Sequence, residues 1–282
     1  MRIGFVGVGL MGHGMALNLL KGGHEVYVVA HHNRTPIEDL LAKGACEARS
    51  FVEIAQVSDY IFLCLSSSAI VEQTISVLQP GLRSGQIIID AGTSEPESTR
   101  RLASELATLG IGYADAPMTG GPEQAGNGEL GILCGASPET FSSILPLLSS
   151  YATTIRHMGP VGSGHAAKLI SNFLVTGMVA LVAQAFGAAR KADIDWRNLY
   201  EVMLNGSGNS GVLRKMVAPA LDGDFEGYKF ALANAAKDIT YFKALATGIG
   251  LETSLAAAVQ VVFEDAVAKG HGAKNVSHLL AL

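Results

Sequence analysis

The stretch Gly7-Val8-Gly9-Leu10-Met11-Gly12 decides the fold of this chain, because its glycines have the spacing G-x-G-x-x-G. It follows an apolar run over Ile3–Val6, typical of a buried strand, and opens a helical pattern over Gly12–Lys21. In such a unit the first glycine allows a tight turn, the second lets a pyrophosphate approach the backbone, and the third lets helix and strand pack closely. The pattern favours a dinucleotide-binding loop over a glycine-rich turn without a ligand, and it predicts cofactor contacts from Gly7, Gly9, Leu10, Met11 and Gly12.

Short apolar runs alternate with helical patterns up to Pro160, as in parallel βαβ units. We expect strands at Ile3–Val6, Glu25–Val29, Tyr60–Leu65, Ile87–Asp90, Gly112–Asp115 and Leu130–Cys134, with helices that include Gly12–Lys21, Ile70–Leu78 and Glu97–Leu109. After Pro160 the chain is rich in alanine and leucine and reads as helical throughout. The sequence therefore predicts an α/β Rossmann-type dinucleotide-binding domain over residues 1–162. An all-helical (all-α) substrate and oligomerisation domain is expected over 163–282, with a long helix at the junction.

Composition narrows the class of protein. Only 16% of residues are charged and the net charge is −5, which argues against nucleic-acid and polybasic membrane partners. Leu169–Ala189 is uncharged and long enough to span a bilayer, but its polar side chains favour a buried inter-domain helix and no membrane partner. Cys46, Cys64 and Cys134 have neither metal-ligand nor disulfide-framework spacing, so we expect no metal and free thiols in a cytoplasmic protein. The thinly charged surface and the apolar helix predict a homodimer or homotetramer.

The end of the second expected strand bears on the choice of cofactor. NAD sites usually have an acidic residue there that binds the ribose 2′-hydroxyl, whereas an arginine can hold the 2′-phosphate of NADP. Here the chain has His31, His32 and Arg34 and no acid before Thr35. We therefore predict NADP, with NAD as the alternative cofactor, and Arg34 as the phosphate contact. The alternative interpretation of these three side chains is a solvated loop.

Two further segments carry polar groups at places where a substrate could bind. Thr119-Gly120-Gly121 follows a strand, and a hydroxyl with backbone N–H groups in such a turn can converge on a carboxylate. Lys168 and Asn172 are four residues apart, so they share one face of the long apolar helix near its start. Desolvation and the helix N-terminus would lower the pKa of such a lysine, which suits it to acid–base chemistry at a carbonyl. The alternative is a lysine that reaches solvent and an amide that caps a neighbouring element.

Together these segments resemble the β-hydroxyacid dehydrogenase family, which includes 3-hydroxyisobutyrate dehydrogenase and tartronate semialdehyde reductase. The likeness runs in order along nearly the whole chain and rests on four stretches: GFVGVGLMG at Gly4–Gly12, DAPMTGG at Asp115–Gly121, GSGHAAKLISN at Gly162–Asn172, and Lys237-Asp238. Without the resemblance, Lys237-Asp238 would be interpreted as an exposed ion pair.

The resemblance implies a role for each matching residue. It makes Lys168 the catalytic lysine, Asn172 the residue that orients it, and Thr119, Gly120 and Gly121 the cradle of the substrate carboxylate. It also implies that Leu65, Ser66 and Thr93 lie near the ribose and nicotinamide, and that Lys237 closes over cofactor and substrate. The family usually has serine where Thr119 stands and proline where Ser66 stands.

The resemblance implies an NAD(P)-dependent oxidoreductase that interconverts a small 3-hydroxy acid, a carboxylate substrate, and its semialdehyde by hydride transfer. An imine or bulkier-carbonyl reductase of the same architecture is one alternative, although such imine reductases generally have aspartate or tyrosine where Lys168 stands. A non-catalytic NAD(P)-binding sensor is the other alternative, and it would not need Lys168.

Overall fold

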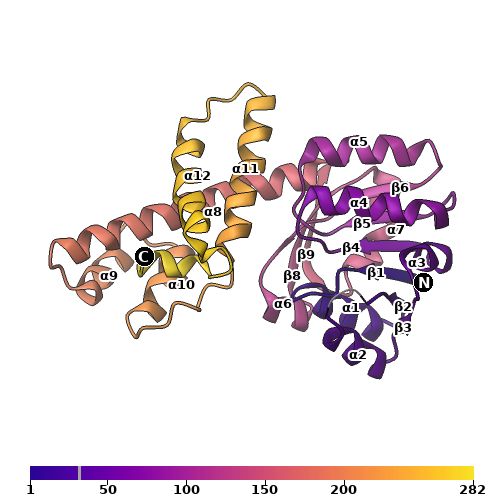
Figure 1. Ribbon diagram of the computed structural model, residues 1–282, viewed down its shortest axis with the longest axis horizontal. Coiled ribbons are helices and arrows are strands. Elements are labelled where there is room, and N and C mark those ends of the chain that lie inside the picture. The colour runs from indigo at the N-terminus through magenta and orange to yellow at the C-terminus, as the bar shows by residue number, and fades with distance from the viewer. Residues whose placement is uncertain (31–32) are drawn as a thin grey trace. The chain divides into compact units, whose positions relative to one another are not determined.

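The computed structural model describes residues 1–30 and 33–282 (Figure 1), so the predicted contribution of His31 and His32 lies outside the described residues. The chain forms two compact units, Met1–Lys168 and Leu169–Leu282.

A nine-stranded sheet forms the centre of the N-terminal unit, with the order β3-β2-β1-β4-β5-β6-β8-β7 and β9 paired to β8. Its strands are β1 (Arg2–Val6), β2 (Glu25–Val28), β3 (Cys46–Glu47), β4 (Tyr60–Leu63), β5 (Ile87–Asp90), β6 (Gly112–Asp115), β7 (Met118–Thr119), β8 (Leu130–Gly135) and β9 (Ala152–Gly159). The first six strands pair in parallel with the Rossmann order 3-2-1-4-5-6. This order brings the carboxyl ends of β1, β2, β4 and β5 to one edge, where a dinucleotide binds in such folds.

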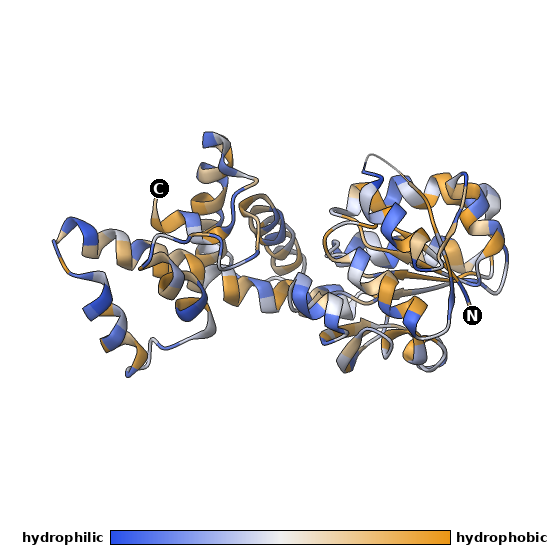
Figure 2. Ribbon diagram, turned by 90° about the horizontal axis from the view of Figure 1, so that it is seen from below, coloured by the Kyte–Doolittle hydropathy of each residue, from blue (hydrophilic) through white to orange (hydrophobic). Residues whose placement is uncertain are grey.

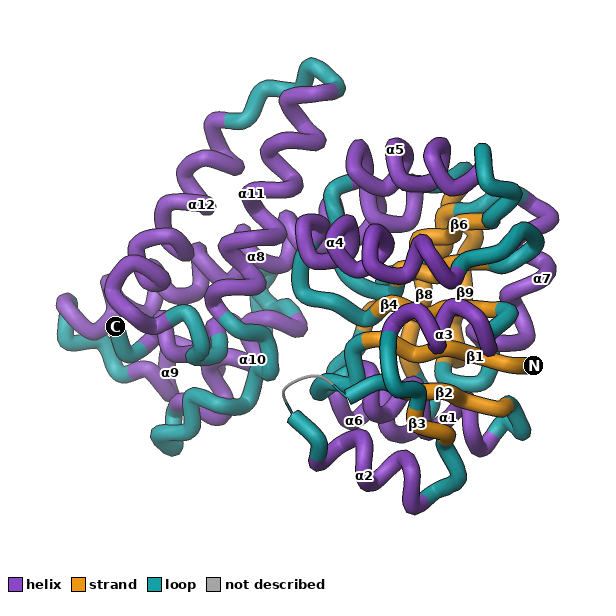
Figure 3. Tube along the Cα trace, turned by 45° about the vertical axis from the view of Figure 1, so that its right-hand side comes forward, coloured by secondary structure: helices purple, strands orange, loops and turns teal. Residues whose placement is uncertain are grey.

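Helices cover both faces of this sheet, which Figure 3 shows between them. They are α1 (Gly12–Lys21), α2 (Thr35–Ala42), α3 (Phe51–Val57), α4 (Ser68–Leu78), α5 (Pro96–Ala107), α6 (Pro122–Asn127) and α7 (Pro138–Leu148). Successive strand residues point to opposite faces. Ile61 and Leu63 therefore pack with α3, α4 and α5, while Phe62 between them packs with α1 and α7. Because both faces of the sheet are buried at its centre, the central strands β1, β4 and β5 are almost uniformly hydrophobic (Figure 2).

The predicted Rossmann-type fold is confirmed, and three sequence-predicted elements, Gly12–Lys21, Ile87–Asp90 and Gly112–Asp115, have the bounds expected. The expectation of parallel βαβ units holds as far as β6. Beyond it the chain turns back: β8 pairs antiparallel with β6 and β7, so the sheet is mixed. The short strands β3 and β7 and the exposed edge strand β9 lack the apolar runs by which the other strands were found.

The C-terminal unit is helical, as expected. Its helices are α9 (Trp196–Leu204), α10 (Gly211–Ala220), α11 (Leu232–Gly248) and α12 (Ser254–Ala266), preceded by α8 (Ser163–Lys191), which begins in the N-terminal unit and continues into this one. Val179 and Phe186 of α8 are buried in the core of the unit with Met216, Ile239 and Phe263.

Helix α8 buries one side and exposes the other. By length and composition it could cross a membrane, but 33% of its most apolar window is buried inside the structure. Leu174 and Leu181 on the other side are 65% and 68% exposed. The helix is therefore a core element of this unit that also presents apolar side chains at the surface.

Candidate functional site

The loop between β1 and α1 has the geometry that its glycines predict. Gly7 has a φ of +99°, and a Cβ at this position would lie 2.2 Å from the carbonyl oxygen of Cys64. A Cβ on Gly12 would lie 2.1 Å from the oxygen of Gly7, so helix α1 can meet the strand only at a glycine. At Gly9, by contrast, a Cβ would meet nothing within 4 Å. Gly7 and Gly12 are thus needed for the fold of the loop, whereas Gly9 leaves open space where a ligand can approach the backbone.

The start of α1 is suited to an anion. Its N-cap residue, Met11, makes no side-chain hydrogen bond to the first turn, and no acidic residue lies in that turn. The N–H groups of an uncapped first turn, with the helix dipole behind them, form a binding site for phosphate. Leu10 and Gly9 before it are exposed, so the site is accessible from solvent.

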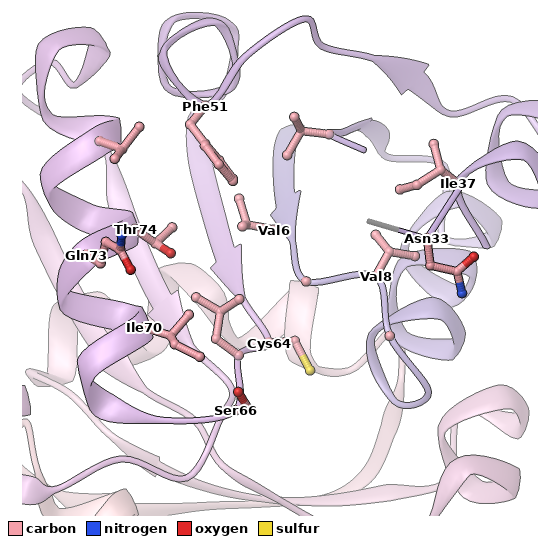
Figure 4. Close-up of a pocket in the computed structure, with 15 residues that line it drawn as sticks. Val6, Val8, Asn33, Ile37, Phe51, Cys64, Ser66, Ile70, Gln73 and Thr74 are labelled. Carbon is pink, nitrogen blue, oxygen red and sulfur yellow. The ribbon is translucent and has the colours of Figure 1, made fainter. Parts of the chain in front are cut away.

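A cavity of about 600 Å³ opens beside this loop (Figure 4). One wall comes from the glycine loop and the end of β2, and the other from the end of β4 and helix α4. The lining residues are Val6, Gly7, Val8, Gly9, Val29, Asn33, Ile37, Phe51, Cys64, Leu65, Ser66, Ile70, Gln73, Thr74 and Val77. Leu65 and Ser66 are thus part of the cavity wall, beside the glycine loop. Burial and the charge of Asp90 raise the pKa of the Cys64 thiol to about 12, so this cysteine contributes a neutral side chain to the wall.

Arg34 lies at a second, smaller cavity of about 460 Å³, which shares Val29 with the first and is also lined by Glu47 and Arg49. Its guanidinium donates two hydrogen bonds to Glu47, at 3.0 and 3.2 Å, and lies 3.5 Å from Glu38. These hydrogen bonds raise the pKa of Arg34. Two arginines thus border the place expected for a 2′-phosphate, but one of them is already engaged by a carboxylate.

Thr119, Gly120 and Gly121 form the turn between β7 and α6. Gly120 has a φ of +113°, and the Thr119 hydroxyl donates to the Gly131 carbonyl at 3.4 Å. The N–H of Gly121 donates to the Gln124 side chain at 2.9 Å, as part of the capping of α6. A carboxylate bound here would have to draw the Thr119 hydroxyl proton away from the Gly131 carbonyl, and it would have to displace Gln124 to reach the Gly121 amide. Thr93 lies in the partly exposed loop after β5.

Lys168 lies in the second turn of α8 and is partly buried, and Asn172 follows one turn later with 9% of its surface exposed. The Asn172 amide donates to Asp238 Oδ2 at 2.6 Å. Asp238, only 4% exposed, also lies 3.1 Å from the Lys237 ammonium, which in turn lies over the ring of Tyr241. The adjacent Lys237 and Asp238 are thus not an exposed ion pair: they form a buried network that fixes the orientation of Asn172.

Comparison with known proteins agrees with this geometry. Residues 2–159 match the family model described as the NAD binding domain of 6-phosphogluconate dehydrogenase. Residues 162–282 match the model described as NAD-binding of NADP-dependent 3-hydroxyisobutyrate dehydrogenase. The chain is also 33% identical to 2-(hydroxymethyl)glutarate dehydrogenase of Eubacterium barkeri, over 99% of this chain and 93% of that protein. The chain belongs to the β-hydroxyacid dehydrogenase family.

Two further relatives of this dehydrogenase support the same assignment. It is 29% identical to 2-hydroxy-3-oxopropionate reductase of Escherichia coli, over 96% of this chain and 92% of that protein. The crystal structure of a 3-hydroxyisobutyrate dehydrogenase from Salmonella typhimurium matches with a TM-score of 0.88 and 26% identity, over 100% of this chain and 99% of that one. The protein is therefore an NAD(P)-dependent hydroxyacid dehydrogenase.

Several residues of the site were not predicted from the sequence. The cavity wall on α4, with Ile70, Gln73 and Thr74, reads in the sequence as an ordinary amphipathic helix. The sequence alone predicts Asp238 as half of a surface ion pair, although a charged residue inside an alanine-rich helix is a possible signal of a buried role. Glu47 lies on a strand too short to show a pattern.

Proposed function

We propose that this dehydrogenase interconverts a small 3-hydroxy acid and its semialdehyde, with Lys168 as general acid and base and with NADP as the preferred cofactor. The observation that carries the proposal is the buried Asn172, which lies one helical turn after Lys168. Its amide group is held in place by a hydrogen bond to Asp238. A rigid amide beside a partly buried lysine is an arrangement for orienting a reacting group.

The residues divide the chemistry between them. When bound, the nicotinamide cofactor supplies the hydride that reduces the aldehyde carbon. Lys168 donates a proton to the developing alkoxide oxygen, and in the reverse direction it removes that proton from the alcohol. The Asn172 amide, with its nitrogen engaged by Asp238, presents its carbonyl oxygen as the remaining acceptor. The Thr119 hydroxyl and the turn up to Gly121 hold the carboxylate.

The glycine loop and the uncapped start of α1 fit the cofactor pyrophosphate, and the cavity between α4 and the end of β2 fits its adenosine half. Arg34, together with Arg49, supports a preference for NADP, because both border the smaller cavity at the end of β2. Since Glu47 already holds Arg34, the 2′-phosphate must compete with this carboxylate.

The named relatives point to a common chemical class of substrate. 2-(Hydroxymethyl)glutarate, 3-hydroxyisobutyrate and reduced 2-hydroxy-3-oxopropionate all contain a CH₂OH group on the carbon that carries the carboxylate. They differ only in the third substituent of that carbon: a carboxyethyl, a methyl or a hydroxyl group. We propose that this protein acts on the same unit, HOCH₂–CHR–COO⁻, and that the substituent R selects the substrate.

The test is NADPH consumption at 340 nm with a panel of aldehydes: the semialdehydes of methylmalonate, tartronate and succinate, glyoxylate, and the aldehyde corresponding to 2-(hydroxymethyl)glutarate. We expect turnover with at least one member that carries an aldehyde next to the CHR–COO⁻ unit. A cyclic imine is assayed alongside these aldehydes, and turnover of the imine alone would refute the proposal in favour of an imine reductase. Saturable NADPH binding without turnover of any compound would refute it in favour of a sensor.

We also propose a homodimer or homotetramer assembled through the helical unit, supported by the exposed leucines of α8. A monomer in light scattering at micromolar concentration would refute this. The three cysteines are free in the structure, in agreement with the proposed cytoplasmic location.

A further inference from the structure

A buried polar cluster lies where the carboxyl ends of β5 and β6 meet the start of α8. Asp90, Asp115 and His165 each have no exposed surface, and Thr99 is 1% exposed. None of these four side chains has a role in the chemistry proposed above. Burying two carboxylates and an imidazole is costly unless they are hydrogen-bonded, so their partners indicate what the cluster does.

Both carboxylate oxygens of Asp115 accept hydrogen bonds from the backbone at the start of helix α8. Oδ1 accepts the N–H of Gly162 and Oδ2 accepts the N–H of His165, each at 2.7 Å. A carboxylate at the end of a strand thus satisfies two backbone donors at the start of a helix 47 and 50 residues further along the chain. Charge-assisted bonds to a helix N-terminus are among the stronger hydrogen bonds in proteins. Burial raises the pKa of Asp115, and the nearby His165 and the two backbone donors oppose that rise.

The backbone approaches so closely here that side chains are excluded. A Cβ on Gly164 would lie 2.3 Å from the Leu133 carbonyl oxygen and 2.9 Å from Asp115 Oδ2. A Cβ on Gly135 would lie 2.5 Å from Asp115 Oδ1. Backbone atoms have little freedom to move away, so the first turn of α8 is seated against the sheet at a single position.

His165 completes the connection from the other side. The Thr99 hydroxyl donates its one proton to the Glu95 carbonyl at 3.0 Å, so it accepts from His165 Nδ1, which lies 2.8 Å away. His165 Nε2 then faces Asp90 Oδ2 at 3.7 Å, and Asp90 is itself held by the Gly92 amide and the Ser94 hydroxyl. The imidazole therefore ties the first turn of α8 to helix α5 through Thr99, while its Nε2 makes no hydrogen bond within the described part of the chain.

We propose that Asp115 and His165 are positioning residues for Lys168. Lys168 is three residues after His165 on the same helix, so the two side chains are neighbours and share the placement of this turn. Asp115 also begins the segment that continues to Thr119 and Gly121, so one side chain links the carboxylate-binding turn to the helix of the proposed acid. This inference rests on the proposed function of Lys168.

The experiment compares Asp115→Asn, Thr99→Val and Gly164→Ala with the wild type in the full-length enzyme, using the best substrate of the aldehyde panel. The Asn variant keeps the shape but loses the charge and one acceptor, and the Val variant removes only the hydroxyl that holds His165. Gly164→Ala displaces the turn without changing any charge. Gly177→Ala in the same helix is the matched control, because its Cβ would meet nothing within 4 Å.

Turnover is expressed per NADPH-binding site, counted by stoichiometric titration, so that misfolded protein does not enter the result. We expect kcat to fall at least 20-fold in Asp115→Asn and Gly164→Ala and at least 5-fold in Thr99→Val. The Kd for NADPH stays within twofold, and the primary isotope effect with deuterated NADPH increases in each variant. Gly177→Ala keeps the wild-type kcat. A purely structural role predicts fewer binding sites, each with wild-type kcat.

Different results would overturn the positioning role of Asp115 and His165 and the catalytic role of Lys168. If Lys168→Met loses turnover while Thr99→Val and Asp115→Asn keep wild-type kcat per site, the positioning role is overturned and the role of Lys168 stands. If Asp115→Asn does not fold, Thr99→Val, a nearly isosteric change, decides in the same way. If Lys168→Met keeps turnover, the lysine mechanism is overturned and the inference falls with it.

Discussion

The hydrogen bond between Asn172 and Asp238 allows a quantitative prediction for Asp238→Ala. Both side chains are buried, at 9% and 4% exposure, and the Nδ2–Oδ2 distance of 2.6 Å is that of a charge-assisted bond. Such bonds contribute about 1.5–3 kcal/mol, and removal of one partner leaves a buried donor without an acceptor. We therefore expect Asp238→Ala to lower the free energy of unfolding by about 2–3 kcal/mol. Asp238→Asn keeps an acceptor oxygen at this place and should cost about 1 kcal/mol.

The single tryptophan makes this loss measurable in the right part of the chain. Trp196 lies in the C-terminal unit and packs edge-on against Phe186, so its fluorescence reports the unfolding of that unit. In urea titrations, 2–3 kcal/mol corresponds to a decrease of the midpoint by about 0.7–3 M, given slopes of about 1–3 kcal/mol per M. The matched control is Asp265→Ala, which removes an exposed ion pair with Lys269 and should change the free energy by less than about 0.5 kcal/mol. A loss of less than 0.5 kcal/mol in Asp238→Ala would refute the network described here.

Three further predictions concern other parts of the molecule. Glu47→Gln frees Arg34 for the 2′-phosphate, so the ratio of kcat/KM for NADPH over NADH should rise about three- to tenfold. Glu38→Gln removes a more distant contact of Arg34 and should change this ratio less than twofold. An equal change of the ratio in both variants would exclude a special role for Glu47. A disulfide reagent at pH 8 should label Cys46 rapidly and the other two thiols slowly. Cys46 is exposed, whereas burial raises the pKa of Cys64 and Cys134 to about 12. Rapid labelling of more than one thiol would contradict this difference in reactivity. Hydrogen bonds from Arg2 and Arg83 hold the pKa of Asp59 below its ordinary value of 3.8, so the stability that Asp59 contributes is present above that pH and is lost on acidification. The difference in melting temperature between the wild type and Asp59→Asn should therefore shrink from pH 6 to pH 3. A difference that stays constant over this range would argue against this role of Asp59.

The sequence predicted the parts of the fold that depend on local patterns. Strands such as Ile87–Asp90 are continuous apolar runs, and the glycine spacing of Gly7–Gly12 requires one loop geometry, so both could be located without a structure. The antiparallel direction of β8 could not be predicted from the sequence. Leu130–Gly135 is as apolar as a parallel strand, and no local pattern indicates the direction in which it pairs.

In the candidate site, too, the sequence indicates features that depend on local patterns and not those that depend on tertiary contacts. Lys168 and Asn172 were found because four-residue spacing on a helix places them on one face. Asp238, which accepts from Asn172, looks like an ordinary charged residue in the sequence. Asp115 and His165, which we propose to position Lys168, match no local pattern, and only tertiary contacts reveal all three. Arg34 was identified as a cation at the right strand end, but its engagement by Glu47 depends on the pairing of β2 with β3.

The most direct test of the account is a single-turnover measurement of NADPH oxidation in Lys168→Met, with the aldehyde that the wild type reduces fastest. Methionine keeps the unbranched stem of the lysine as far as Cε and removes the ammonium group that donates the proton. The account predicts that NADPH binds with a Kd within twofold of the wild type and that the rate of hydride transfer falls by about 10²–10⁴-fold, the usual contribution of a general acid. A hydride-transfer rate within threefold of the wild type, at full NADPH occupancy, would show that Lys168 is not the acid and would contradict the central claim.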